Sequence, residues 1–111
     1  MAELTTLNQN IEFRHAYNRG KSKADPALIT YAVKNRAGVC RFGITVSKKT
    51  GCAVERNRCR RIIRAAYASL AGECTGAWDI VFVARFKTKN LKNTDIEPVM
   101  RRQLEELGVI G

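Results

Sequence analysis

A cluster of basic side chains in the segment 53–67 has the composition of a phosphate-binding surface. It contains five arginines and one asparagine: Arg56, Asn57, Arg58, Arg60, Arg61 and Arg64. A guanidinium group is planar, so it can donate two hydrogen bonds to one phosphate and still stack on a base. Arginines spaced i, i+4 on a helix repel one another by roughly 0.2–0.5 kcal/mol. Because the face that carries them includes no acid, we expect an anionic partner to supply the counter-charge. A solvated helix face is the alternative, and a mixture of Lys, Glu and Gln would favour it.

A second basic segment, 47–51, precedes this cluster and reads Ser-Lys-Lys-Thr-Gly. Lys48 and Lys49, with the neighbouring hydroxyls and backbone N–H groups, are typical of a loop that receives a phosphate beside a helix N-terminus. The residue order of a nucleotide-hydrolysing P-loop is missing. The segment therefore indicates phosphate binding without nucleotide hydrolysis.

Three aromatic residues, Phe13, Tyr17 and Tyr31, are candidates for stacking on unpaired bases. Phe13 and Tyr17 lie four residues apart, so they share one face of a helix. An exposed ring stacks on a base for roughly 1–3 kcal/mol with little preference for sequence. The alternative is the hydrophobic core, which is the commoner place for a phenylalanine such as Phe13.

Catalytic and metal-ligating patterns are weak in this chain. His15 is the only histidine, and the ten acids are scattered rather than paired beside a nucleophile. The four cysteines, at positions 40, 52, 59 and 74, have no C-x-x-C spacing, so a zinc site would need several remote ligands. We therefore expect a binding protein with no active site of its own, no bound metal and free thiols.

A helix over 53–71 is expected to position the arginine cluster. Its apolar residues recur at i, i+3, i+4 and i+7: Cys59, Ile62, Ile63, Ala66, Tyr67 and Leu70. Asn57, Arg60, Arg61 and Arg64 fall on the opposite face, away from the core. Arg58 and Arg56 lie at the two borders of the apolar stripe, and we expect Arg56 to lean towards whatever packs beside the helix start.

The other elements follow from turn residues and alternation. The pattern predicts a first helix over 8–18, capped by Asn8 and closed by a left-handed Gly20. Strands are predicted over 27–34, 39–46 and 78–85. A last helix is predicted from a capping box of Thr94 and Glu97 to Gly108. Residues 35–38 predict a hairpin, hence an antiparallel pair of strands. Alternation puts Phe42, Ile44 and Val46 on a core face and Thr45 and Ser47 on the other. Because 78–85 is apolar on both alternating positions, we expect it to be a central strand of an α+β sandwich.

Length and charge limit the class of protein. With 111 residues we expect one domain over 1–111, and the net charge of +10 favours nucleic acid as the partner. From Arg36 to Arg64 there are nine basic residues and one acid, Glu55, so the charge is concentrated. No segment has the 18 or more apolar residues of a membrane span, and the N-terminus lacks a signal-peptide pattern. We expect a cytoplasmic protein.

A family resemblance emerges from these motifs. The segment 43–49, GITVSKK, followed by Gly51, Ala53, Val54 and the arginine cluster, resembles the signature of the protein subunit of bacterial ribonuclease P. The likeness extends to Glu12, Phe13, Tyr17, Gly20 and the strands around Tyr31 and 78–85, and so covers most of the chain. Two features depart from the family pattern. Residues 5–10 lack the basic run that members often carry, and Tyr17 stands where Phe is common.

The resemblance implies a fold and a division of labour. The fold is a two-layer α/β sandwich of the ribosomal protein S5 domain 2-like type, with a left-handed βαβ crossover through the arginine helix. In this family the catalyst is the large RNA subunit, which uses Mg²⁺ to remove the 5′ leader of precursor tRNA, and the protein assists. The implied partners are that RNA and precursor tRNA, not DNA or a membrane. A ribosomal or other RNA-binding protein with no part in tRNA processing is the main alternative, and a self-sufficient nuclease is the second.

The resemblance also assigns roles to residues. The arginine cluster defined above would bind the catalytic RNA. A cleft between the first helix and the sheet would receive the single-stranded leader, through Phe13, Tyr17, Tyr31 and Thr45, with Lys48 and Lys49 near its edge. We expect Arg56 to face this cleft rather than the main RNA surface.

Overall fold

The computed structural model describes residues 5–7 and 9–110. The strands are β1 (Thr5–Thr6), β2 (Lys21–Asp25), β3 (Leu28–Lys34), β4 (Arg41–Thr45) and β5 (Trp78–Ala84). The α-helices are α1 (Asn10–Arg19), α2 (Ala53–Leu70) and α3 (Asn93–Leu107), and short 3-10 turns occupy Lys48–Thr50, Ala71–Glu73 and Phe86–Asn90.

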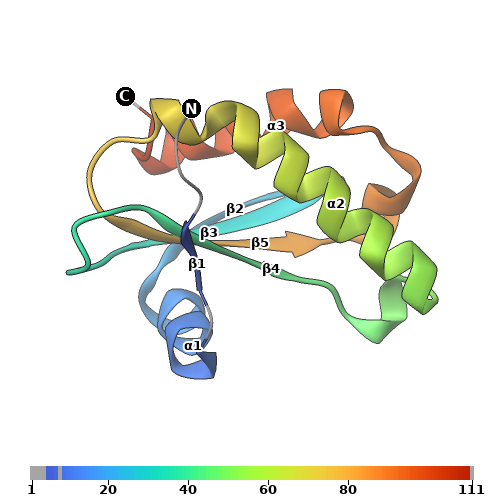
Figure 1. Cartoon of the computed structure of the whole chain (residues 1–111), viewed down its shortest axis with the longest axis horizontal. Coiled ribbons are helices and arrows are strands. Elements are labelled where there is room, and N and C mark those ends of the chain that lie inside the picture. The colour runs from blue at the N-terminus through green and yellow to red at the C-terminus, as the bar shows by residue number, and fades with distance from the viewer. Residues whose placement is uncertain (1–4, 8, 111) are drawn as a thin grey trace.

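The strands form one sheet in the order β1-β4-β5-β3-β2. Helices α2 and α3 cover one face of this sheet, and α1 lies against the other (Figure 1). The larger core lies between the sheet and α2 and α3, and includes Phe42, Ile80 and Phe82. A smaller core lies under α1, where Ala16 and Val81 are fully buried. The predicted α/β sandwich is confirmed, with α1 as an addition to its second face.

The predicted hairpin between β3 and β4 is wrong. Strand β5 lies between them, antiparallel to β3 and parallel to β4. The connection is held over the start of β5, because the Asn35 backbone N–H donates to the Ala77 carbonyl (3.0 Å) and its side-chain amide donates to Asp79 (2.7 Å). The most apolar strand thereby takes the central position, where both of its faces are covered. That central position was predicted for 78–85.

The parallel pair β4 and β5 is joined through α2. With α2 above the sheet, β4 lies in front of β5 and both run the same way, so the crossover is left-handed, as the resemblance implied (Figure 1). Most such crossovers are right-handed. The arrangement places the start of α2 beside the end of β4, next to the turn Lys48–Thr50.

Strand β2 was not predicted. Its residues pair antiparallel with β3, with Ser22 opposite Tyr31. β2 is an edge strand whose first four residues are exposed, so it carries no alternating apolar pattern. Asp25 ends it by accepting a hydrogen bond from the Ala27 backbone N–H (2.9 Å).

The ends of two helices differ from prediction. The Gln9 backbone N–H donates to the Glu12 carboxylate at the start of α1 (3.1 Å), whereas Asn8 lies outside the described residues. Gly20 has φ −78°, so it is not left-handed, and glycine is needed there because a Cβ would lie 2.9 Å from the Ala32 carbonyl oxygen. At the start of α3, the carboxylate that accepts the Lys92 backbone N–H is that of Asp95 (2.9 Å). The predicted pair of Thr94 and Glu97 is therefore wrong, but Gly108 does close α3 in a left-handed conformation (φ 87°).

The apolar stripe of α2 is confirmed in full. All six of its predicted residues are buried, and the helix begins at Ala53 as expected and ends at Leu70, one residue early. On β4, Phe42 is buried in the larger core and Ile44 and Val46 pack against it. Thr45 faces the other way, towards α1, where its hydroxyl bonds Tyr17. The sequence pattern therefore distinguished the core face from the opposite face correctly in both α2 and β4.

Candidate nucleic-acid interface

The outward face of α2 carries exposed cations that pair with no acid in the part of the chain that the structure describes. Asn57, Arg58, Arg60, Arg61 and Arg64 are exposed, and Arg56 is half-buried. Among the described residues, no ion pair includes an arginine of this helix. The arrangement is therefore a concentrated positive surface that an anion would stabilise.

The single acid of α2 is engaged away from this surface. Glu55 accepts the Cys52 backbone N–H (3.0 Å) and pairs with Lys89 (3.1 Å). The bond from Cys52 and the ammonium of Lys89 lower the pKa of Glu55 below its ordinary value. Glu55 therefore stays charged at neutral pH, and its charge is matched by Lys89 rather than by the arginines.

Individual arginines are oriented by neighbours. Arg60 donates to the Asn57 side-chain oxygen (2.9 Å), and Arg58 donates to the Lys89 backbone carbonyl (3.0 Å). The guanidinium of Arg64 lies 5.9 Å from the centre of the Phe42 ring. A groove of about 320 Å³ runs beside the helix, with Arg58, Arg61 and Lys92 around an apolar floor. Lys92 thus adds a cation to the arginine surface. The periodicity of α2 could not predict this, because Lys92 lies outside that helix.

On the opposite face of the sheet, a cavity of about 320 Å³ opens between α1 and β4. We call it the aromatic cavity, and its lining residues are Asn10, Phe13, Tyr17, Ile44 and Thr45. The Tyr17 hydroxyl lies 2.6 Å from the Thr45 hydroxyl oxygen, and the ring of Tyr17 meets that of Tyr31 edge to face, with centres 5.0 Å apart. The fold thus brings together four residues that were predicted to bind the leader, from α1, β3 and β4: Phe13, Tyr17, Tyr31 and Thr45.

Gly43 positions Phe13 in this cavity. A Cβ added to Gly43 would overlap the ring of Phe13, which lies directly on the strand. Phe13 is partly buried against the smaller core, so its ring is held in place. Tyr17 is 37% exposed, so its ring is accessible to a ligand. The core interpretation of Phe13 is therefore correct in part, because the same ring packs on the sheet and lines the cavity.

The two lysines and Arg56 do not line the aromatic cavity. Lys48 and Lys49 are exposed in the turn after β4, and Lys49 borders a separate hollow with Arg85 and Phe86. Arg56 belongs to α2, which covers the other face of the sheet (Figure 1). The expectation that Arg56 faces the cleft is therefore wrong.

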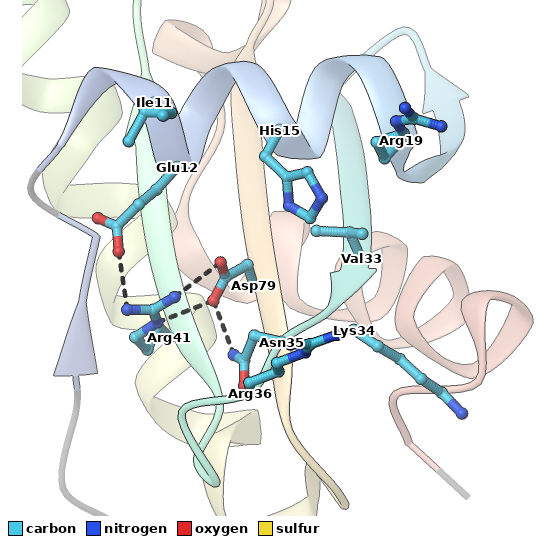
Figure 2. Close-up of a pocket in the computed structure, with 10 residues that line it drawn as sticks. All are labelled: Ile11, Glu12, His15, Arg19, Val33, Lys34, Asn35, Arg36, Arg41 and Asp79. Carbon is cyan, nitrogen blue, oxygen red and sulfur yellow. Dashed lines mark hydrogen bonds and ion pairs between the residues drawn. The ribbon is translucent and has the colours of Figure 1, made fainter.

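Sequence reasoning missed an ion-pair network that anchors α1. Arg41 on β4 bonds Asp79 on β5 through two N–H groups (both 2.9 Å) and Glu12 on α1 (2.7 Å), as Figure 2 shows. Asn35 donates a further hydrogen bond to Asp79 (2.7 Å). Asp79 is buried, and its bonds to Arg41 raise the pKa of that guanidinium. The network holds α1 at a set distance from the sheet. Since the aromatic cavity opens between α1 and β4, the network also sets the width of that cavity.

A larger cavity of about 620 Å³ lies beside this network, on the side of α1 away from the aromatic cavity. His15 points into it above Val33, as seen in Figure 2. Its two carboxylates, Glu12 and Asp79, are both bound to Arg41. Neither carboxylate is left beside the histidine as a ready acid or base.

Other chemistry finds little support among residues 5–7 and 9–110. Within these ranges, no three or more His, Cys, Asp or Glu side chains gather in a way that could hold a metal ion. No helix among the same residues has the length and apolar character needed to span a membrane. The four cysteines are free thiols, as predicted.

Comparison with known proteins gives one consistent family. The family model of ribonuclease P matches residues 1–108. The ribonuclease P protein component of Clostridium botulinum (strain Loch Maree / Type A3) is 38% identical over 104 residues, which cover 93% of this chain and 94% of that protein. That of Clostridioides difficile (strain 630) is 36% identical over 104 residues, covering 93% and 91%.

A solved structure agrees with these relatives. The ribonuclease P protein of Staphylococcus aureus superposes with a TM-score of 0.85 at 29% identity, covering 98% of this chain and 100% of that one. The family match spans almost the whole chain, and the structural match covers the whole of the Staphylococcus aureus protein. The chain therefore belongs to the ribonuclease P family, as a protein component of the bacterial enzyme that processes the 5′ ends of tRNA.

Proposed function

We propose that this chain is the non-catalytic subunit of ribonuclease P and that it holds two RNAs on opposite faces of its sheet. The arginine surface of α2 binds the catalytic RNA, and the aromatic cavity binds the single-stranded 5′ leader of precursor tRNA. The observation that carries this proposal is the cationic face of α2, whose arginines pair with no acid among residues 5–7 and 9–110 and which the sheet separates from a cavity lined with aromatic rings. The cell compartment is then the cytoplasm, where these RNAs are made and processed.

The two surfaces suit two kinds of contact. Phosphate contacts fix the position of an RNA without reading its sequence, which suits docking on a large folded RNA. Stacking on aromatic rings accepts many bases, which suits leaders of different sequence. The hydroxyl pair of Tyr17 and Thr45 adds polar groups that can bond a base edge or a 2′-hydroxyl.

Chemistry is assigned to the RNA rather than to the protein. The only imidazole, that of His15, lies on α1 beside two carboxylates that Arg41 already binds. Mg²⁺ would be held by the catalytic RNA, and the protein would favour its occupancy indirectly, because cationic side chains let two polyanions approach. We propose no metal ligand within the protein itself and no contact with DNA or membrane.

Reconstitution tests the proposal. The protein is combined with ribonuclease P RNA, and the cleavage of precursor tRNA is measured at low Mg²⁺ concentration with and without it. We expect the protein to bind the RNA and to raise kcat/KM for precursor tRNA. Cleavage by the purified protein without RNA would show an active site in the protein, and a lack of RNA binding would remove the proposed role altogether.

A further inference from the structure

The sheet face under α1 continues beyond the aromatic cavity. Thr45 pairs with Val83, and Val83 pairs with Ile29, so the three residues form one row across β4, β5 and β3. Their neighbours Leu28 and Phe82 are buried in the larger core on the other face. Since successive side chains alternate, the row lies on the α1 side, where all three residues are only partly buried. The row is a partly open path that starts at the aromatic cavity.

A second hollow lies at the far end of this row. It has a volume of about 230 Å³, and we call it the distal hollow; its lining residues are Ile29, Ser47, Lys49, Thr50, Ala84, Arg85 and Phe86. Ile29 belongs both to the row and to the distal hollow, as Thr45 belongs both to the row and to the aromatic cavity. The two depressions are therefore linked along one surface.

Phe86 is an exposed aromatic ring at the distal hollow. Its exposed fraction is 67%, and Tyr17 is the only other aromatic residue among residues 5–7 and 9–110 that is classed as exposed. A single exposed phenylalanine is common on protein surfaces. Here, however, both exposed rings lie at the two ends of one row, and two cations, Lys49 and Arg85, line the hollow beside Phe86.

The ring of Phe86 is supported from one side. The ammonium of Lys89 lies 4.2 Å from the ring centre, and the same ammonium pairs with Glu55 at the start of α2 (3.1 Å). The side chain of Lys89 is only 13% exposed, so this support is largely buried. A ring supported in this way keeps its orientation and leaves most of its surface to a ligand.

We propose that Phe86 is a second stacking platform for the leader strand, with Lys49 and Arg85 as the cations for its phosphates. The inference rests on the proposed leader-binding role of the aromatic cavity and extends it along the row to the distal hollow. The occupant is a single-stranded RNA segment, because the surface combines exposed rings with cations and has no acid in the distal hollow. Phe86 thereby adds affinity for a leader long enough to reach from one hollow to the other.

The test uses the reconstituted holoenzyme and two substrates, mature tRNA and precursor tRNA with a leader of about ten nucleotides, within the site sizes of such grooves. Affinity is measured for Phe86→Ala, Phe86→Tyr and Tyr17→Ala. Val54→Ala serves as the control, because Val54 is also exposed and apolar (76%) but lies on α2, away from the row. Thermal unfolding by circular dichroism checks that each variant folds.

We expect Phe86→Ala to weaken precursor binding by at least about fivefold, the lower limit for loss of one base stack, with mature tRNA unchanged. Phe86→Tyr should bind precursor tRNA as tightly as the parent does, because it keeps an aromatic ring, and Val54→Ala should leave this affinity unchanged. If Tyr17→Ala weakens precursor binding but Phe86→Ala does not, the second platform is refuted while the proposed function stands. If neither Tyr17→Ala nor Phe86→Ala weakens precursor binding, both the second platform and the proposed leader binding by the aromatic cavity are refuted. Equal losses for precursor and mature tRNA would also refute leader stacking on Phe86.

Discussion

Replacing Arg41 with Ala is expected to destabilise the fold strongly, because it leaves a buried carboxylate without its counter-charge. The side chain of Asp79 is 4% exposed and that of Arg41 is 25% exposed. The substitution removes two charge-assisted hydrogen bonds to Asp79 and the ion pair that ties Glu12 of α1 to β4.

The loss in free energy of unfolding depends on which partners Asp79 keeps in the variant. Removing one member of a buried ion pair costs about 3–5 kcal/mol. Asn35 still donates to Asp79 in the variant, and water can enter where the partly exposed guanidinium stood. We therefore expect a loss at the lower end, about 3 kcal/mol, which is a large part of the 5–15 kcal/mol that typically stabilises a small domain.

Urea denaturation followed by circular dichroism measures this loss. With a slope of about 1–3 kcal/mol per molar urea, the midpoint should fall by about 1–3 M. Arg41→Lys should lose less, because it keeps the charge but not the two-pronged geometry. Arg41→Ala combined with Asp79→Asn should recover at least half of the loss, since the buried charge is gone. An Arg41→Ala variant as stable as the parent, or a double variant no better than the single one, would refute this account of the network.

Three further predictions concern the cavity, the core and the thiols. Gly43→Ala should displace the ring of Phe13 and weaken the binding of precursor tRNA but not of mature tRNA, whereas unchanged precursor affinity would contradict the close contact. Gln103→Leu leaves the buried Thr30 hydroxyl without its 2.6 Å partner, so urea denaturation should show a loss of about 1–3 kcal/mol; a neutral result would contradict that. Iodoacetamide at neutral pH should modify exposed Cys52 before the other thiols, whose pKa burial raises, and mass spectrometry showing equal labelling would disagree.

The parts of the fold that depend on local pattern were predictable. Helix α2 has an apolar stripe from Cys59 to Leu70, so its buried face and its exposed arginines follow from periodicity. Strand β5 is apolar on both faces, which indicates a central place in the sheet. These features need no knowledge of distant residues.

The order of the strands depends on pairings distant in sequence and was predicted less well. A short polar connection after β3 favours a hairpin, but the register of β5 with both β3 and β4 overrides it. Edge strand β2 was missed because an exposed edge has no alternation to detect. The left-handed crossover came from the family resemblance, since general packing rules favour the opposite hand.

The candidate site was predictable in composition but not in assembly. Periodicity placed Phe13 and Tyr17 on one face of a helix, but only the fold brings Thr45 within hydrogen-bond distance of Tyr17. The network around Arg41 joins residues from α1, β4 and β5, so no local pattern indicates it. Lys49 lies four residues after the end of β4, in the turn Lys48–Thr50, and it lines a different hollow from Thr45.

The most direct test of the central claim is the salt dependence of binding to ribonuclease P RNA. The parent is compared with the triple variant Arg60→Ala, Arg61→Ala and Arg64→Ala. The control, Arg19→Ala, Lys21→Ala and Arg36→Ala, removes the same charge from exposed positions outside α2. Log affinity falls linearly with log salt, and each lost phosphate contact should reduce the steepness of that fall by about 0.7–0.9. We predict that the slope of the α2 variant is shallower by about two to three and that the slope of the control changes little. An unchanged slope for the α2 variant, or an equal flattening in both variants, would contradict RNA binding by this helix.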